Sequence, residues 1–261
     1  MQPEGARHIV ITGASAGLGR ALAHTYARPG TVLGLCGRDA TRLRECAFEC
    51  EALGAKAVVA TLDVRDAAAM SSWIDDFDAH WPIDMLIANA GAASTLSNAS
   101  DWEDSHRVRS IVDVNLYGTI NSVLPALTHM RERKHGRIVL ISSIAALRGM
   151  AISPAYCASK SAIKAWGDSL RPMLARDGIA LSVVLPGFVK TAMSDVFPGD
   201  KPMMRSAPSA AALIARKVAA GRAEIAFPTL LALGMRLLAL LPVAIADRIL
   251  DRLSYLPKAE A

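Results

Sequence analysis

The sequence predicts an α/β protein built on one doubly wound parallel sheet, with helices on both faces. Apolar runs of strand length alternate regularly with helix-length segments, and neither a repeat nor a low-complexity linker divides the chain. Hydrophobic residues make up 52% of the 261 residues, but aromatic residues only 5%. Buried parallel strands and the helices that cover them are rich in small and branched aliphatic residues. These observations indicate a single large domain with a substantial core.

The expected elements follow this alternation from the first strand onward. Parallel neighbours need a helix-length crossover, and right-handed crossovers produce a doubly wound, Rossmann-type sheet. Seven strands are expected, at residues 8–12, 31–36, 57–62, 85–88, 137–141, 179–185 and 224–227. The intervening helices are expected at residues 20–27, 41–53, 67–80, 103–133 and 153–177.

A helical extension is expected after the last strand, so that residues 1–227 form the domain and residues 228–261 the extension. Its first helix, residues 229–241, is apolar on nearly every side. Pro242 ends it, and a second, more amphipathic helix is expected at residues 244–255. A helix that is apolar all round must be buried, and this one is shorter than the roughly 20 residues that span a bilayer.

Three locations for this extension stay open. It can form a lid over a pocket, a contact between subunits, or a shallow insertion into a membrane surface beside Arg236 and Arg248. Each is compatible with a bulky or lipid-like ligand.

The net charge of +5 is not concentrated in one place. Lys and Arg are spread along the chain, and the densest group, residues 131–135, includes Glu132 and is interpreted as a solvated helix end. Nucleic-acid binders usually gather basic and stacking aromatic residues on one face. No nucleic-acid partner is therefore expected.

The four cysteines form no CxxC pair. Cys46 and Cys50 are four residues apart on an expected helix, where we interpret them as two reduced thiols near its surface. No metal site is expected, because no histidine lies nearby in the sequence to complete one. The segment of residues 1–7 is short and polar and does not resemble a signal peptide, so a cytoplasmic location is expected.

A glycine-rich turn joins the first strand to the first helix. Gly13 permits a tight turn, and residues without a β-carbon let backbone N–H groups approach a pyrophosphate at the helix N-terminus. This position in a βαβ unit predicts a dinucleotide-binding site. The candidate contacts are Gly13, Ser15, Ala16, Gly17, Leu18 and Gly19.

The end of the second strand, Gly37-Arg38-Asp39, faces the adenosine ribose in such a sheet. A carboxylate there favours NAD(H), whereas an arginine pairs with the 2′-phosphate of NADP(H). Arg38 therefore indicates NADP(H), and NAD(H) stays possible. Asp39 comes one or two residues late and is expected to cap the next helix.

Tyr156 and Lys160 are four residues apart and share one helix face. A free phenol has a pKa of about 10, and a neighbouring ammonium would lower it toward neutral pH. Ser143, thirteen residues before the tyrosine, could hold a substrate oxygen on which charge develops. Ser142 is the competing hydroxyl.

Taken together and in order, these motifs resemble the short-chain dehydrogenase/reductase family over about residues 6–195. The match rests on the glycine-rich turn, Asp63, Asn89-Ala90-Gly91, Asn115, Ser143, Tyr156 with Lys160, and Pro186-Gly187. The resemblance implies an enzyme that interconverts a carbonyl and a secondary alcohol by hydride transfer. Residues 1–227 would then bind the dinucleotide and carry the catalytic residues.

The same resemblance implies a role for each matched position. Asn115, Ser143, Tyr156 and Lys160 would be the catalytic residues, with Tyr156 the general acid/base and Asn115 holding a water of a proton relay. Lys160 would also hold the nicotinamide ribose, with Tyr156 beside it. Asp63 and Val64 would contact the adenine, and Asn89, Ala90 and Gly91 would lie beside the cofactor. Pro186, Gly187, Val189 and Thr191 would border the nicotinamide.

The family also implies a small-molecule carbonyl or alcohol as substrate and a homo-oligomer, with a dimer favoured over a tetramer by the altered tail. Residues 192–209 would cover the substrate, and their Met193, Phe197, Met203 and Met204 indicate an apolar pocket. Two alternatives stay open: an NADP(H)-binding sensor without catalysis, and a membrane-associated scaffold of the same fold.

Overall fold

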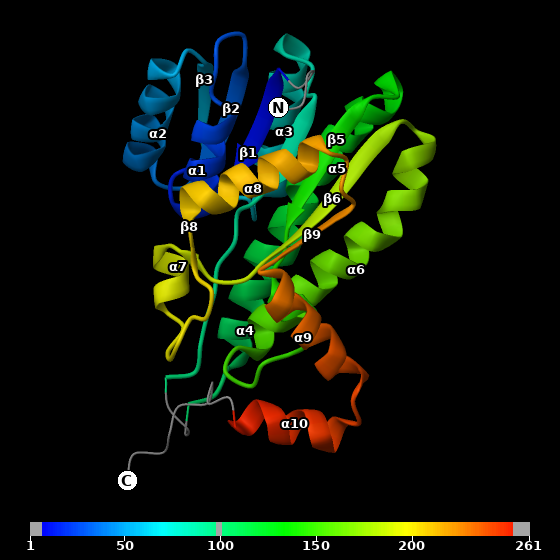
Figure 1. Cartoon of the computed structure of the whole chain (residues 1–261). Coiled ribbons are helices and arrows are strands. Elements are labelled where there is room, and N and C mark those ends of the chain that lie inside the picture. Colours follow the sequence, from blue (N-terminus) through cyan, green and yellow to red (C-terminus); the bar gives the residue numbers. More distant parts are fainter. Residues whose placement is uncertain (1–6, 98–100, 253–261) are drawn as a thin grey trace.

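The computed structural model describes residues 7–97 and 101–252, and its centre is a seven-stranded parallel sheet (Figure 1). The strand order is β3-β2-β1-β4-β5-β6-β9. The strands are β1 (His8–Thr12), β2 (Val32–Gly37), β3 (Lys56–Thr61), β4 (Met85–Ala88), β5 (Gly136–Ile141), β6 (Ile179–Pro186) and β9 (Glu224–Phe227). The predicted fold class is therefore confirmed. The order reverses between β1 and β4, where doubly wound sheets bind their ligands.

The central strands are buried on both faces, which explains their continuous aliphatic sequences. Every residue of β4 is buried, and β1 pairs with β2 on one side and with β4 on the other. The outermost strand β3 has a largely accessible surface. The carboxyl ends of β1, β4, β5 and β6 consequently meet at one edge of the sheet.

Helices cover both faces of the sheet (Figure 1). One face packs against α1 (Gly17–Tyr26), α2 (Ala40–Ala52) and α8 (Ala207–Ala219). The other packs against α3 (Ala67–His80), α5 (Gly118–Arg133) and α6 (Pro154–Arg176). The Asp39 side chain accepts hydrogen bonds from the N–H groups of Thr41 and Arg42, so it caps α2 as the sequence predicts.

The helix expected at residues 103–133 is interrupted by a wide turn. It consists of α4 (Ser105–Val112), a π-helical turn (Asp113–Tyr117) and α5. The N–H of Gly118 donates to the carbonyl of Asp113, five residues earlier. A π-turn inserts one residue into an α-helix and shifts the phase of the helix, but the segments on either side keep the helical period, so the sequence pattern did not reveal it.

The region between β6 and β9 contains more structure than the sequence pattern predicts. Two two-residue strands, β7 (Val189–Lys190) and β8 (Arg205–Ser206), pair with each other, and α7 (Ala192–Asp195) lies between them. Helix α8 was not expected, although Ser206 caps it and Pro208 lies in its first turn. A short 3-10 turn (Ile144–Ala146) follows β5.

The C-terminal extension forms α9 (Thr229–Leu240) and α10 (Val243–Arg252), which lie beyond the carboxyl edge of the sheet (Figure 1). The single chain does not cover α9 on every side, and burial of its other side against a partner or a membrane surface stays a prediction. Ala232 and Leu238 are buried, but Leu230 and Leu240 are 68% and 81% exposed, because only one side of α9 packs against the domain. The predicted end of the second helix, residues 253–255, lies outside the described residues.

Within the described residues, no helix combines the length and apolar character that a bilayer crossing requires.

Candidate active site

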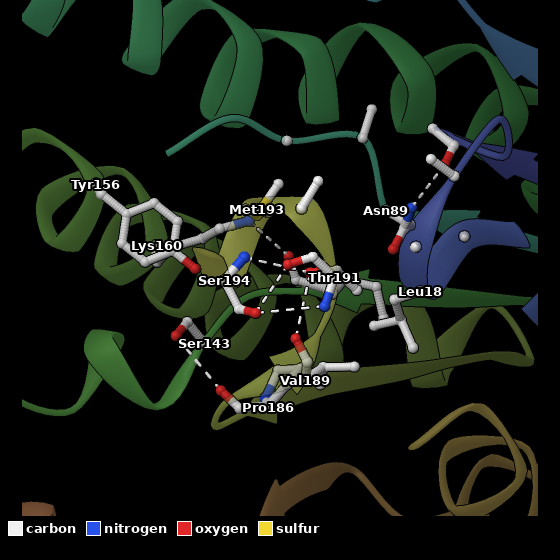
Figure 2. A pocket seen from close by; sticks show the side chains of 18 of the residues that line it. Leu18, Asn89, Ser143, Tyr156, Lys160, Pro186, Val189, Thr191, Met193 and Ser194 are labelled. Carbon is white, nitrogen blue, oxygen red and sulfur yellow. Dashed lines mark hydrogen bonds between the residues drawn. The ribbon is translucent and has the colours of Figure 1, made fainter. Parts of the chain in front are cut away.

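A cavity of about 640 Å³ opens at the carboxyl edge of the sheet, where the strand order reverses. All the predicted cofactor contacts line it: Gly13, Ser15, Ala16, Gly17, Leu18, Gly19, Arg38, Asp63, Val64, Asn89, Ala90, Gly91, Tyr156, Lys160, Pro186, Gly187, Val189 and Thr191. Ser143 lines it as well. In Figure 2, Tyr156, Lys160 and Ser143 lie at one end of this cavity, and Asn89 and Leu18 at the other.

The glycine-rich turn has little room for side chains. Gly13 has a φ of +66°, and a β-carbon there would lie 2.8 Å from Cα of Ala90. A β-carbon on Gly19 would lie 2.1 Å from the carbonyl oxygen of Gly13. Asn89 Nδ2 donates to the carbonyls of Thr12 and Gly13 at 3.0 and 3.2 Å, which ties the turn to the end of β4.

Helix α1 begins at this turn without a side-chain cap, because its N-cap residue is Ala16. Its first residues, Gly17, Leu18 and Gly19, line the cavity. The first N–H groups of a helix have no partner within it and carry the positive end of its dipole. This arrangement fits a pyrophosphate.

The far end of the cavity is lined by charged residues of both signs, namely Arg38, Arg42, Asp39 and Asp63. Arg38 is exposed and its Nη1 lies 4.0 Å from Oδ2 of Asp63. The Arg65 guanidinium, with Nη2 2.7 Å from Oδ2 of Asp63, holds the pKa of that carboxyl below its usual range. Arg42, one turn into α2, also lines the cavity and was missed by sequence reasoning. Its position three residues after the capping Asp39 could have indicated it.

Tyr156 is buried in the first turn of α6, where its ring packs edge-on against Phe197 with the ring centres 5.6 Å apart. Burial raises the pKa of Tyr156 to about 12, although a hydrogen bond with Ser143 acts in the opposite direction. The expected lowering of the Tyr156 pKa by Lys160 is therefore wrong for this structure. Removal of the phenolate from water is the largest effect on this pKa, and the Lys160 nitrogen lies 5.8 Å from the ring centre.

Lys160 is 3% exposed, and its Nζ donates to the carbonyl of Ile141 at 3.0 Å. Burial lowers the pKa of Lys160 to about 8, because the charged form loses its hydration. The ammonium therefore titrates close to neutral pH.

The two competing serines lie in different environments. Ser142 Oγ donates to the carbonyl of Lys160 at 2.7 Å, so its hydroxyl is engaged with the start of α6. Ser143 Oγ donates to the carbonyl of Pro186 over a longer 3.4 Å, and its hydroxyl lowers the pKa of Tyr156 against the effect of burial. Of the two, Ser143 is the hydroxyl that accompanies the tyrosine.

Asn115 does not line the cavity but lies behind its wall, fully buried in the π-helical turn. Its Oδ1 accepts from the N–H of Ala92 at 2.7 Å. Its Nδ2 donates to the carbonyl of Ala92 at 3.0 Å and to Ser159 Oγ at 2.9 Å. A β-carbon on Gly91 would lie 3.2 Å from Asn115 Oδ1 and 3.4 Å from Lys160 Nζ. The amide therefore joins the segment after β4 to α6, beside the lysine.

The wall nearest Tyr156 is apolar. Of the four side chains expected to cover a substrate, Met193 and Phe197 line the cavity, whereas Met203 and Met204 are largely exposed and do not. A lid over a pocket was one of the three locations left open for the extension, but its individual lining residues were not predicted from the sequence. Leu231 and Met235 of α9 and Leu250 of α10 line the same cavity.

An ion pair of 2.7 Å between Arg148 Nη2 and Asp247 Oδ1 connects α10 to the segment before α6.

Comparison with known proteins agrees with this geometry. Residues 7–201 match the family model of the short chain dehydrogenases. The chain belongs to the short-chain dehydrogenase/reductase family. It is therefore an oxidoreductase that acts on a small molecule, and its fold is one that binds NAD or NADP.

One relative spans nearly the whole chain, and another spans about two thirds of it. An "uncharacterized oxidoreductase" of Myxococcus xanthus is 36% identical over 95% of this chain and 97% of its own length. A ketoacyl reductase, HetN, of a Nostoc species is 35% identical over 69% of this chain and 63% of its own.

Solved structures show the same fold. A short chain dehydrogenase of Mycobacterium paratuberculosis bound to NAD superposes with a TM-score of 0.75, at 25% identity, over 84% of this chain and 95% of its own. Actinorhodin polyketide ketoreductase with NADPH gives a TM-score of 0.76 at 24% identity, over 89% and 99%.

Proposed function

We propose that this enzyme interconverts a carbonyl and a secondary alcohol with NADP(H), and that Tyr156 is its general acid/base. The proposal rests on one observation. Tyr156, Ser143 and Lys160 gather at one end of a cavity whose other end is the glycine-rich turn and the uncapped start of α1. A dinucleotide seated along this cavity would bring its reactive ring to the tyrosine.

The residues of the cavity fit such a cofactor. The first N–H groups of α1 would receive the pyrophosphate, and the close packing at Gly13 and Gly19 keeps that turn in shape. Asp63 and Val64 would contact the adenine, and Pro186, Val189 and Thr191 the nicotinamide. The bound nicotinamide would supply or accept a hydride at the substrate carbon.

The preference for NADP(H) is supported by charge. Arg38 and Arg42 both border the cavity at the ribose end and would pair with a 2′-phosphate. The competing carboxylate, Asp39, is engaged as the cap of α2 and lies 3.4 Å from Arg42 Nε. Asp39 also lines the cavity, but the Arg42 guanidinium beside it partly balances its charge.

The raised pKa of Tyr156 leaves its phenol protonated at neutral pH, which suits the donor of a proton in carbonyl reduction. Ser143 would hold the same substrate oxygen as charge develops on it. Lys160 would hold the ribose and, with a water anchored at Asn115, return a proton to Tyr156. Alcohol oxidation would use the same groups in reverse.

An apolar or bulky substrate is supported by the wall beside Tyr156. Phe197 packs against Tyr156, and Met193, Leu231, Met235 and Leu250 line the same cavity. Residues 1–227 would carry cofactor binding and catalysis, and the extension that begins at residue 228 would act as a lid. The exposed leucines on the outer side of α9 also support peripheral contact with a membrane surface.

We also propose a cytoplasmic homodimer. Tyr117, Leu124 and Met173 are exposed apolar side chains on the helices that flank the sheet beside the site, and pairing of α5 and α6 with a second copy would cover them. Size-exclusion chromatography with light scattering would measure this, and a monomer at micromolar concentration would contradict it.

The decisive experiment is a panel of carbonyl and alcohol substrates assayed by NADPH absorbance, with NADH in parallel. We expect turnover with an apolar ketone or secondary alcohol and a preference for NADPH. Tyr156→Phe should abolish turnover and leave cofactor binding, measured by fluorescence, nearly unchanged. Full turnover by this variant would refute the role of Tyr156. A lower KM for NADH than for NADPH would refute the role of Arg38.

A further inference from the structure

A second cluster of chemically active side chains lies between α1 and α2, away from the lining of the cavity. His24 comes from α1, and Cys46 and Cys50 come from α2. One ligand atom from each, a ring nitrogen or a thiol sulfur, lies within 4.8 Å of the other two. No other trio of His, Cys, Asp or Glu within residues 7–97 and 101–252 gathers in this way.

The sequence alone does not reveal this cluster. Cys46 and Cys50 were expected near a helix surface without a histidine, but both are 0% exposed and face the α1 side of the sheet. The histidine is supplied by α1, twenty-two residues before Cys46 in the chain. Packing of two helices on the same sheet face therefore brings together three residues that no local motif connects.

We propose that His24, Cys46 and Cys50 bind one zinc ion. Tetrahedral zinc has ligand bonds of about 2.0–2.3 Å, which separate its ligand atoms by roughly 3.3–3.8 Å. The ligand atoms lie within 4.8 Å of one another, so their separations need to shrink by at most about 1.0–1.5 Å, which side-chain rotation can supply. Two thiolates and an imidazole are soft ligands that favour zinc over magnesium or calcium.

The charges around the cluster suit this ion. Two thiolates balance the charge of Zn²⁺, so that the occupied site is neutral.

Glu49 is a positioning residue for the imidazole. Its Oε2 lies 2.7 Å from His24 Nε2, a ring nitrogen that is buried and has no well-aligned hydrogen bond. Arg20 Nε donates to the same carboxylate oxygen at 2.9 Å. Carboxylates that contact a metal-bound histidine fix its orientation and strengthen it as a ligand. The fourth zinc position would be filled by water, on the accessible side of His24.

The site would fasten together two helices that border the cofactor cavity. Helix α1 starts at the glycine-rich turn, and α2 starts directly after Arg38 and Asp39. An ion that binds only the folded arrangement stabilises it. Zinc would therefore raise the thermal stability of the whole protein without touching the reacting atoms.

The test uses the full chain, freed of any affinity tag, treated with a chelator and kept reduced. Titration with Zn²⁺ should give one ion per chain by elemental analysis and raise Tm by several degrees. Titration with Co²⁺ should produce the near-ultraviolet absorption of thiolate-to-cobalt charge transfer. A stoichiometry near zero, or cobalt binding without that absorption, would overturn the proposal.

Variants locate the ion. Cys46→Ala and Cys50→Ala should lose the charge-transfer absorption and the rise in Tm, whereas Cys36→Ala, an equally buried thiol outside the cluster, should keep both. Equal responses of Cys36→Ala and Cys46→Ala would contradict the site. His24 is half-exposed, so His24→Gln should fold even if the cysteine variants do not, and it should weaken zinc at least tenfold. Glu49→Gln should weaken zinc 10- to 100-fold and keep the absorption.

Discussion

The Lys160 ammonium nitrogen lies 5.8 Å from the centre of the Tyr156 ring, and its hydrogen bond goes to the carbonyl of Ile141. Both side chains are buried, with opposite effects on their pKa values. Burial raises the pKa of the phenol to about 12 and lowers the pKa of the ammonium to about 8. The group that changes charge near neutral pH in this structure is therefore the lysine.

This relationship predicts a pH profile for carbonyl reduction. Below pH 8 Lys160 is charged and Tyr156 protonated, so kcat/KM should be constant. Above pH 8 the ammonium is lost, and kcat/KM should fall by about tenfold per pH unit. The profile is measured between pH 6 and pH 10 with the fold monitored by circular dichroism. A profile that stays flat to pH 10 would show that the lysine charge is not needed.

Cofactor preference should depend on the two arginines at the ribose end. Arg38→Ala and Arg42→Ala should each weaken NADPH about 10- to 100-fold and leave NADH nearly unchanged, because only NADPH carries the 2′-phosphate. The control is Arg44→Ala. Arg44 is exposed and lies in α2 like Arg42, but it does not line the cavity. Calorimetric titration measures both cofactors. Equal losses for NADPH and NADH would contradict the assignment.

The apolar wall supplied by the extension should affect large substrates more than small ones. Met235→Ala and Leu250→Ala remove side chains that line the cavity and should raise KM for a bulky ketone about 10-fold, by loss of roughly 1–2 kcal/mol of apolar contact each. Leu240→Ala removes an exposed leucine of the same helix as Met235 and should have no effect. An unchanged KM in all three variants would exclude the lid.

Stability should depend on the buried carboxylate of Asp78. Its two oxygens accept from Arg133 Nη1 and Nη2 at 2.6 and 2.8 Å, and Oδ1 also accepts from Ile83 N–H. Burial opposes ionisation, yet these bonds hold the pKa of Asp78 below its usual range. Asp78→Asn should lower the free energy of unfolding at pH 7 by about 2–3 kcal/mol.

The sign of this pH dependence follows from the lowered pKa. The stabilisation is complete above the unfolded pKa of about 4 and is lost as the pH falls through the folded value. Urea unfolding should therefore show a difference between Asp78→Asn and the parent protein at pH 7 that shrinks toward pH 3. Asp76→Asn, on the exposed side of the same helix, should stay within about 0.5 kcal/mol. A difference that persists unchanged at pH 3 would contradict the ion pair.

Much of the fold was predictable because burial of the strands on both faces determines the sequence pattern of the whole sheet. Strands buried on both faces, such as β4 at Met85–Ala88, require continuous aliphatic sequence, and helix α3 begins and ends as predicted at residues 67 and 80. The local sequence pattern did not predict elements that depend on contacts between residues distant in the sequence. Strands β7 and β8 have two residues each, too few for any period to be detected.

The candidate site divides in the same way. Residues at the ends of strands, such as Asn89 and Pro186, were predictable because those ends meet at one edge of a parallel sheet. Leu250 was not, since its approach to the cavity depends on how α9 and α10 turn back after Pro242. The shifted pKa of Lys160 was also out of reach, because it arises from burial and not from sequence neighbours.

The π-helical turn at Asp113–Tyr117 also acts as a rotational spacer. Each residue turns an α-helix by about 100°, so deleting one residue from this turn would restore an unbroken α-helix and swing Asn115 away from Ala92 by about that angle. The helix would become more regular while the amide network beside Lys160 came apart. The irregular turn is what directs the Asn115 amide toward Ala92, so a design that replaced it with a regular α-helix would damage the site.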